Sequence, residues 1–302
     1  MKNIKVYSML FLGMAFFGSA TPVSKLVVEH FSVFTGGALR VLLAFLILLP
    51  FVNLKNILDF KGRDAWLIAG IGIIGVVGFT SFLLYGMTMV SGVVGSIIMS
   101  STPAVVATLS YLIFRDHFGW RKSVAIALAV AGILVLQLGS TENGRVEASL
   151  LGVIMVFAAI LCEAAYTLMG KALTKDFKPI QIAAFSALIG FIGFIPLAAF
   201  QYESGMFENV ATEGWLALAW YGLGTMGIGS VLWYKGVQKV DGSTAAGFMG
   251  VMPLSALLLS YFLLGESFEW IHLIGFAMVF AGVVLIIQVH RRMAKKEKNN
   301  TD

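Results

Sequence analysis

Ten apolar runs follow one another along this chain, and each is long enough to cross a membrane as a helix. A bilayer core about 30 Å thick needs about 20 apolar residues in a helix. No connection between the runs is long enough to hold a soluble domain. The predicted spans are 6–27, 33–53, 65–87, 92–114, 122–139, 150–171, 180–200, 214–236, 243–264 and 269–289. The sequence therefore predicts an all-α integral membrane protein with ten transmembrane helices.

The composition agrees with lipid as the main solvent of this chain. Of its 302 residues, 12% are charged, whereas an ordinary soluble domain has roughly 25%. Hydrophobic residues make up 59%, and an apolar exterior carries no penalty where it faces lipid. The first run, which follows Lys2 and Lys5, could pass for a signal peptide. Because many further apolar runs come after it, we interpret it as the first transmembrane helix.

The connecting segments alternate in charge along the chain. Of the 21 Lys and Arg residues, 18 lie in one set of alternate connections or at the helix ends beside it. The opposite set is rich in Glu, and Arg145 is the basic residue of its loops. Basic loops stay in the cytoplasm, so we expect a multi-pass protein of the cell membrane with both termini cytoplasmic. The basic tail 291–302 is then a cytoplasmic anchor and not a nucleic-acid site.

The two halves of the chain resemble each other in sequence. Lys25 and Pro50 match Lys171 and Pro196 at an offset of 146 residues, and further along the offset is 150. At the second offset Gly86, Pro103, Leu109, Ser110, Tyr111, Phe118, Trp120, Ala131 and Gly132 match Gly236, Pro253, Leu259, Ser260, Tyr261, Phe268, Trp270, Ala281 and Gly282. The shared register of Trp, Tyr and Pro residues indicates an internal repeat.

This repeat predicts two five-helix domains, 1–139 and 140–290, followed by the tail 291–302. Because five is an odd number, the second repeat must enter the membrane from the side opposite to the first. The two repeats are then related by a pseudo-two-fold axis in the membrane plane. Such inverted repeats are typical of transporters that work by alternating access.

Two charged residues lie deep inside predicted spans. Glu163 comes thirteen residues into the span that starts near Leu150, which places it about 20 Å along that helix. A carboxylate in hydrocarbon costs at least ~2.5 kcal/mol. Glu163 is therefore a candidate for proton coupling or for binding a substrate ammonium, and the alternative is a structural, hydrogen-bonded acid.

Arg40 lies roughly 10 Å deep in the second span. It could pair with Glu163, or hold a substrate carboxylate through a bidentate contact. The alternative is that its side chain extends to the outer surface, the arrangement that we expect for Lys25 and Lys171 near helix ends.

Polar and aromatic residues inside the spans are further candidates for lining a substrate pathway. Ser100 lies in a hydroxyl-rich stretch with Ser96, Ser101 and Thr102. Aromatic rings could contact an organic substrate or a cation, although ordinary packing explains each of them equally well. The aromatic candidates are Tyr85, Tyr166, Trp233 and Tyr234.

Two prolines, Pro103 and Pro253, lie near the middle of the fourth and ninth predicted spans. A proline inside a helix removes one backbone donor and clashes with the carbonyl four residues earlier. The resulting bend could act as a hinge beside the substrate pathway, or it could be a simple kink for packing.

A glycine pattern, G-x-G-x-x-G, occurs twice within spans, from Gly70 to Gly75 and from Gly222 to Gly227. In a soluble α/β protein it would suggest dinucleotide binding, but no strand precedes either copy. We expect these glycines to let their helices approach neighbours closely. The sequence carries no metal, nucleophile or ATP-binding motif, so it predicts neither an enzyme nor a bound cofactor.

Several short patterns occur in a characteristic order. The first span contains 17–19, an aromatic-Gly-Ser run, and then Lys25. Patterns present in both halves are 103–116 with 253–266, and the Ala-Gly pairs 131–132 with 281–282. In these features the chain resembles the drug/metabolite transporter superfamily, specifically its ten-helix EamA-type members. The resemblance covers nearly the whole chain and implies export or exchange of amino acids, related metabolites or drugs by secondary transport.

These observations favour a secondary active transporter that exports amino acids or similar small amphoteric metabolites by alternating access. Arg40 and Glu163 are complementary to a carboxylate and an ammonium, which is the reason for preferring amino acids. One alternative is a nucleotide-sugar or sugar-phosphate carrier, which would call for more cations within the spans. Another is a non-transporting scaffold or receptor, which would need neither the inverted repeat nor the buried charges. The expected partners are a small-molecule substrate and the lipid bilayer, and a homo-oligomer is left open.

Overall fold

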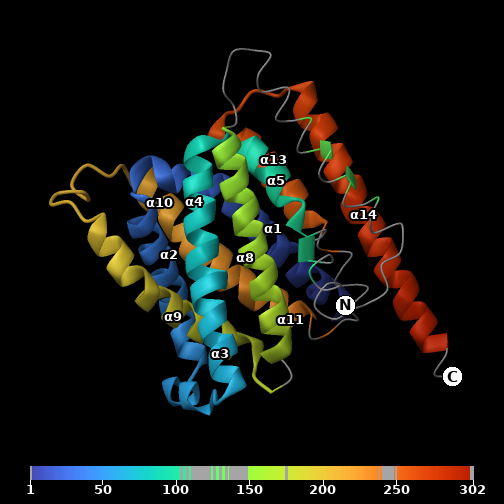
Figure 1. Ribbon diagram of the computed structural model, residues 1–302, viewed down its shortest axis with the longest axis horizontal. Helices are drawn as coiled ribbons and strands as arrows, with labels where there is room; N and C mark the ends of the chain where they lie inside the picture. The colour runs from blue at the N-terminus through green and yellow to red at the C-terminus, as the bar shows by residue number, and fades with distance from the viewer. Residues whose placement is uncertain are drawn as a thin grey trace.

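A computed structural model describes residues 2–102, 149–173, 176–237 and 250–299, together with single residues between 105 and 135 and residues 239 and 248. The described residues form helices and their connections, without a strand among them. In chain order the elements are α1 (Lys2–His30), α2 (Val33–Leu48), the 3₁₀ helices η1 (Leu49–Phe51) and η2 (Leu54–Asp59), α3 (Arg63–Gly70), the π-helix η3 (Ile71–Gly78), α4 (Phe79–Met89), α5 (Gly92–Met99), α8 (Leu150–Leu173), α9 (Pro179–Phe200), α10 (Thr212–Ala219), the π-helix η4 (Trp220–Gly229), α11 (Ser230–Val237), α13 (Val251–Leu264) and α14 (Trp270–Asn299). Figure 1 shows their arrangement as a helical bundle.

The helices are long and apolar where the sequence predicts membrane spans. Six helical stretches within the described residues are long and apolar enough to cross a membrane, and they match the first, second, third, sixth, seventh and eighth predicted spans. These stretches are Ile4–His30, Val33–Phe51, Arg63–Met89, Leu150–Gly170, Pro179–Phe200 and Thr212–Trp233. Two shorter apolar stretches, α13 and the part Trp270–Gly282 of α14, lie in the ninth and tenth spans, and α5 begins the fourth. The predicted all-α membrane fold is confirmed, while span 122–139 lies outside the described residues apart from single positions.

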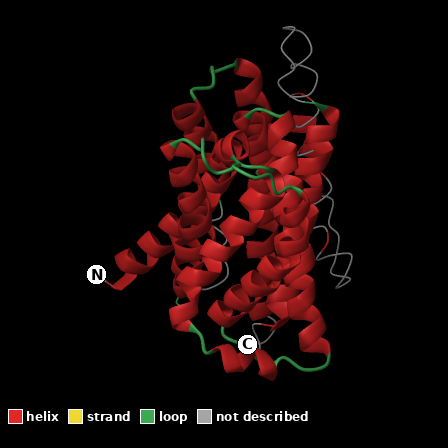
Figure 2. Cartoon of the chain, turned by 90° about the vertical axis from the view of Figure 1, so that its left-hand side faces the viewer, coloured by secondary structure: helices red, strands yellow, loops and turns green. Residues whose placement is uncertain are grey.

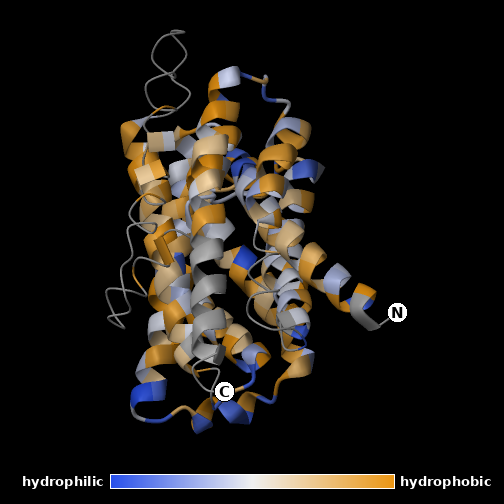
Figure 3. Cartoon of the chain, turned by 90° about the vertical axis from the view of Figure 1, so that its right-hand side faces the viewer, coloured by the Kyte–Doolittle hydropathy of each residue, from blue (hydrophilic) through white to orange (hydrophobic). Residues whose placement is uncertain are grey.

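The helix surfaces are apolar along their length and polar at their ends. In Figure 3 the apolar colour covers the sides of the helices, and hydrophilic segments gather in the connections at the two ends. Figure 2 shows the same helices running between these two ends. This distribution fits a bundle whose sides face lipid and whose ends face water.

Contacts between helix ends define two faces of the molecule, of which the one uppermost in Figure 1 is called the upper face. α1 ends where α10 begins, because the His30 Nε2 lies 3.4 Å from a carboxylate oxygen of Glu213. α4 ends where α8 begins, because the Ser149 N–H donates to the Met89 carbonyl over 3.1 Å. The side chain of Gln201, after the end of α9, accepts a hydrogen bond from the first turn of α2. The upper face therefore contains the ends of α1, α4 and α9 and the beginnings of α2, α8 and α10. This is expected when successive helices cross the membrane in alternate directions.

The two repeats run between the faces in opposite directions. The first helix of the first repeat, α1, ends on the upper face, whereas the first helix of the second repeat, α8, begins there. Likewise, the stack α3–η3–α4 ends on the upper face, while its counterpart α10–η4–α11 begins there. The predicted inverted relation of the repeats is confirmed. The boundaries 1–139, 140–290 and 291–302 stay a prediction.

The packing of the helices also follows the internal repeat. α1 packs on η4 and α11, and α8 packs on η3 and α4. In the first interface, the first helix of the first repeat packs on the third span of the second repeat. In the second interface, the first helix of the second repeat packs on the third span of the first repeat. α2 and α9, the second helices of the two repeats, pack on each other. The central part of the bundle is thus formed by both repeats together.

Close glycine contacts show the register of the repeat at atomic level. A Cβ at Gly72 would lie 2.5 Å from the side chain of Ile189, and a Cβ at Gly222 would lie 2.8 Å from that of Leu43. The two glycines are 150 residues apart and their partners 146, the two offsets of the sequence repeat. The same offsets relate the contact of Gly86 with Val156 to that of Gly236 with Leu10. The prediction that these glycines permit close approach of helices is confirmed.

Candidate functional site

Arg40 is held inside the bundle by neutral partners. Its side chain, on α2, is only 6% exposed. One guanidinium nitrogen donates to the Thr80 hydroxyl over 2.7 Å. The guanidinium carbon lies 3.9 Å from the ring centre of Tyr221 and 5.6 Å from that of Phe79. Hydroxyl and ring contacts stabilise the cation without neutralising it, so the expected alternative of a side chain that extends to the surface does not hold.

Part of the hydrogen-bonding capacity around Arg40 is unused. The Arg40 Nε and the Tyr221 hydroxyl are buried and have no hydrogen-bond partner among the described residues. A buried donor without a partner is costly. An anion bound beside Arg40 would satisfy both the free donor and the charge.

Glu163 faces the interior of the bundle. On its helix, α8, the exposed apolar side chains recur along one stripe, from Leu150 and Ile154 to Phe157 and Leu161. Side chains two residues apart on an α-helix point in directions about 200° apart. Glu163, two residues after Leu161, therefore points away from the exposed stripe. Its half-buried side chain points instead toward the neighbouring helices of the bundle.

A hydroxyl group from the first repeat holds the Glu163 carboxyl. The Thr102 Oγ1 donates to a Glu163 carboxylate oxygen over 3.1 Å. The Thr102 side chain is 8% exposed, and its hydroxyl also lies 2.7 Å from the Met99 carbonyl. The contact joins the hydroxyl-rich stretch after α5 to α8, and hence the first repeat to the second.

Arg40 and Glu163 attract each other without forming a direct ion pair. Their charges interact, and the charge of Arg40 also acts on Tyr166, one turn after Glu163. Among the described residues no Lys or Arg nitrogen lies within 4.0 Å of a carboxylate oxygen, so the two deep charges act across a longer gap. The structure thus brings Arg40, Glu163 and Tyr166 into one region with charges of both signs.

Ser100 belongs to the same stretch as Thr102 but turns back on its own helix. It is 2% exposed, and its hydroxyl donates to the Ile97 carbonyl over 2.6 Å. Ser96 bonds Ser260 across the repeat interface at 2.9 Å. Thr102 is therefore the hydroxyl of this stretch that contacts the acid.

The described contacts of Tyr85 and Trp233 are with residues other than Arg40 and Glu163. Tyr85 lies near the upper face, where its hydroxyl accepts a hydrogen bond from Gln201 over 3.2 Å and its ring packs edge-on against Phe34. Trp233 lies in the interface of α1 with α11, where its backbone closely approaches Gly13. The side chain of Tyr234 lies outside the described residues.

The hinge prediction for the two prolines is not tested by the structure. Pro103 lies outside the described residues. Pro253 is buried in the first turn of α13, a place where proline fits a helix because no earlier carbonyl needs its N–H.

Three contact residues of the deep charges were not singled out from the sequence, namely Thr80, Tyr221 and Phe79. A hydroxyl and a tyrosine inside apolar spans are a weak signal, because packing explains such residues equally well. The third, Phe79, carries no polar signal. Among the described residues no group of three or more His, Cys, Asp and Glu side chains could hold a metal ion.

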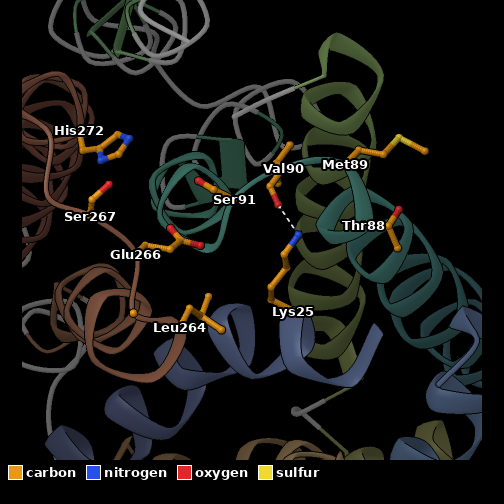
Figure 4. Close-up of a pocket in the computed structure, with 10 residues that line it drawn as sticks. Lys25, Thr88, Met89, Val90, Ser91, Leu264, Glu266, Ser267 and His272 are labelled. Atoms are coloured by element: carbon orange, nitrogen blue, oxygen red, sulfur yellow. Dashed lines mark hydrogen bonds between the residues drawn. The ribbon is translucent and has the colours of Figure 1, made fainter. Parts of the chain in front are cut away.

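A polar cavity, of about 620 Å³, opens at the upper face. Its wall includes the end of α1, the α4–α5 connection and the α13–α14 connection (Figure 4). The Lys25 ammonium donates to the carbonyls of Met87 and Val90 over 2.8 and 2.9 Å. Lys25 therefore bonds the backbone between α4 and α5, where the sequence suggested a side chain extending to the membrane surface.

Glu266 enters the same cavity from the α13–α14 connection. Its two carboxylate oxygens accept hydrogen bonds from the N–H groups of Gly92 and Val93, at 2.5 and 2.7 Å. These are the first amides of α5, where a carboxylate is favoured by unpaired N–H groups and by the helix dipole. Glu266 thus ties the second repeat to the α4–α5 connection of the first.

Comparison with known proteins matches this chain to a family of transporters. The EamA-like transporter family matches this chain twice, over residues 4–138 and 150–288. An uncharacterized transporter of Bacillus subtilis, YetK, is 32% identical over 95% of this chain and 88% of its own length. Another from that bacterium, YyaM, is 28% identical over 94% of each chain.

Two further comparisons extend to a named activity and to a fold. A protein of Streptantibioticus cattleyicolor described as a "probable terminal-alkyne amino-acid exporter" is 23% identical over 75% of this chain and 74% of its own. A solved crystal structure superposes with a TM-score of 0.65 over 95% of this chain and 99% of its own, at 16% identity. The latter likeness shows a shared fold.

Proposed function

This chain belongs to the EamA-like transporter family, and we propose that it is a secondary active exporter of amino acids or similar small amphoteric metabolites. Transport would proceed by alternating access, with the inverted repeats exchanging conformations around a central site. Its membrane would be the cell membrane, with the upper face outside and both termini in the cytoplasm.

The observation that carries this proposal is the arrangement of Arg40 and Glu163. One cation and one acid, from opposite repeats, face the same region and attract each other without direct contact. Each is held by neutral groups, Arg40 by Thr80 and Glu163 by Thr102. A solute that carries a carboxylate and an ammonium would neutralise both charges. Its carboxylate would bind at the free Nε of Arg40 and its ammonium at Glu163.

The composition of the spans and one relative support the amphoteric class. A sugar phosphate carries more negative charge than the single deep cation Arg40 could balance. The amino-acid exporter activity described for the Streptantibioticus relative agrees with a solute of both charges. A scaffold or receptor would have no need for an acid and a base buried within a repeat interface.

The test is transport by the purified protein in liposomes. Counterflow of labelled amino acids, compared with labelled sugar phosphates, should identify an amino acid as a substrate. Counterflow of sugar phosphates alone would contradict the proposed substrate class.

Glu163→Gln tests the role of the acid, because Gln keeps the shape and the hydrogen bond from Thr102 but cannot titrate. Because the proposed site binds the substrate ammonium at Glu163, we expect this variant to fold and insert but to bind substrate more than about tenfold more weakly than the parent, or about 1.4 kcal/mol. Binding within about tenfold of the parent together with a loss of pH-dependent net transport would instead assign Glu163 to proton coupling. Parental binding and transport across the pH range would contradict both roles.

A further inference from the structure

The cavity at the upper face carries two opposite charges that do not neutralise each other. Figure 4 shows Lys25 and Glu266 on different sides of the cavity, with the Lys25 ammonium directed at Val90. Both residues line the cavity, yet each is bonded to backbone groups and not to the other. Lys25 bonds two carbonyls, and Glu266 bonds two amides at the start of α5.

Both charged groups keep unused bonding capacity. An ammonium has three donors, and two of those on Lys25 are engaged with carbonyls. A carboxylate has about four acceptor sites, and Glu266 uses two on Gly92 and Val93. The Lys25 ammonium therefore has one free donor, and the Glu266 carboxylate has about two free acceptor sites. Both groups face a single cavity.

A role in holding the α4–α5 and α13–α14 connections in place does not explain why Lys25 and Glu266 are bonded separately. A direct Lys–Glu bridge would join α1 to the α13–α14 connection and would leave no charge uncompensated. Because each group is anchored to the backbone instead, the two charges stay apart in one cavity. The volume of this cavity, about 620 Å³, lies in the range of small-molecule sites. The cavity wall comes from both repeats, and in transporters built from inverted repeats the solute moves between the two repeats to either face.

We infer that this cavity is a second solute site, which takes small zwitterions with their carboxylate on Lys25 and their ammonium on Glu266. The inference rests on the proposed function for its solute class and adds a separate place of binding. Under the predicted topology, the cavity is an outer vestibule in which the solute pauses on its way out of the central site.

A thiol placed in the cavity can report its occupation directly. Cys162 is the single cysteine of the chain, so Cys162→Ala gives a background without thiols. Ser267→Cys then introduces one thiol at an exposed position that lines the cavity. The rate of its modification by a membrane-impermeant maleimide is measured on the full-length protein in liposomes, with and without amino acids.

We expect zwitterionic amino acids to slow the modification, by about tenfold at ten times their Kd. Matched amines and matched carboxylic acids, which carry only one of the two charges, should protect much less. Lys25→Gln and Glu266→Gln should each abolish the protection. Gln at position 266 can still accept from an α5 amide, so the unprotected rate serves as a check that the cavity is preserved. The matched control is Glu269→Gln in the same connection, which should keep full protection.

The outcomes separate this inference from the proposed function. If amino acids show counterflow but do not protect the thiol, or if protection survives both Lys25→Gln and Glu266→Gln, the vestibule site is refuted and the export proposal stands. If zwitterions protect the thiol but show no counterflow, the vestibule stands and the export proposal is refuted. Protection that disappears in Glu163→Gln but persists in Glu266→Gln would assign the effect to the central site and overturn the inference.

Discussion

The contact between Gly72 and Ile189 allows a quantitative test of how the two repeats pack. A Cβ at Gly72 would lie 2.5 Å from the Cγ2 and 2.7 Å from the Cβ of Ile189. Neither atom can move far, because the β-branched side chain of Ile189 is stiff in a helix. Gly72→Ala must therefore push η3 away from α9.

The size of the effect follows from a matched control. Overpacking costs about 1–3 kcal/mol, whereas replacing Gly by Ala in a helix gains up to about 1 kcal/mol. Gly170, on α8, has no heavy atom within 4 Å of its would-be Cβ, so Gly170→Ala receives the gain without the cost. Reversible unfolding in SDS–detergent mixed micelles should therefore place Gly72→Ala about 1–3 kcal/mol below Gly170→Ala in the free energy of unfolding.

A double-mutant cycle makes the test specific to this contact. Ile189→Gly removes both close atoms, so the cycle with Gly72→Ala should show a favourable coupling of about 1–3 kcal/mol. At the symmetry-related contact the would-be Cβ of Gly222 also lies 2.7 Å from the backbone carbonyl of Arg40. Leu43→Gly leaves that carbonyl in place, so the second coupling should be smaller. Equal stability of Gly72→Ala and Gly170→Ala, or equal couplings in the two cycles, would refute the packing argument.

Three further predictions concern the deep charges and the topology. Tyr221→Leu removes the ring under Arg40 and should weaken substrate binding by the equivalent of about 2 kcal/mol, whereas Tyr221→Phe should bind within a few-fold of the parent; similar binding in both variants would contradict the stacking role. Thr102→Val removes a hydrogen bond to Glu163 and should lower the free energy of unfolding by about 1–3 kcal/mol, with Thr102→Ser close to the parent; a Ser variant as unstable as the Val variant would count against the bond. A reporter fused after Gln288 should give a cytoplasmic signal, and an external signal would contradict the topology.

The fold was largely predictable because hydrophobic length and charge act locally. A run of about 20 apolar residues crosses a bilayer as a helix whatever its partners are, so the described spans lie where the sequence predicts them. The inversion needed only the count of five spans in a repeat. The contacts of Gly72 and Gly222 then repeat the two sequence offsets in space, because equivalent backbones in the two repeats meet equivalent neighbours.

The site was predictable only in its charged residues. A charge in hydrocarbon is costly enough to stand out, which is why Glu163 and Arg40 could be named from the sequence. The hydroxyl-rich stretch that contains Thr102 could also be named, but Thr80 and Tyr221 could not, because the cost of a hydroxyl or a tyrosine inside a span is small and many places satisfy it. Thr80 and Tyr221 act through their distance to Arg40, and that distance depends on how three spans pack together.

Neutral anchoring of charges has a consequence for the transport cycle itself. Arg40 and Glu163 lie in opposite repeats, as do Lys25 and Glu266, and within each pair the charges are bonded to neutral groups. A direct buried ion pair between repeats would have to break whenever they move apart, and breaking such a pair by losing one partner costs about 3–5 kcal/mol. Arg40 and Lys25 are anchored within the first repeat, whereas Glu163 and Glu266 are anchored on neutral groups of the other repeat. A hydrogen bond from a neutral group to a charge is worth about 1.5–3 kcal/mol, so these contacts cost less to break than a buried ion pair and leave the charges able to attract a solute. In the proposed alternating-access cycle, a solute that occupied both charges would carry the electrostatic contact from one repeat to the other, so its binding would draw the repeats together and its departure would release them.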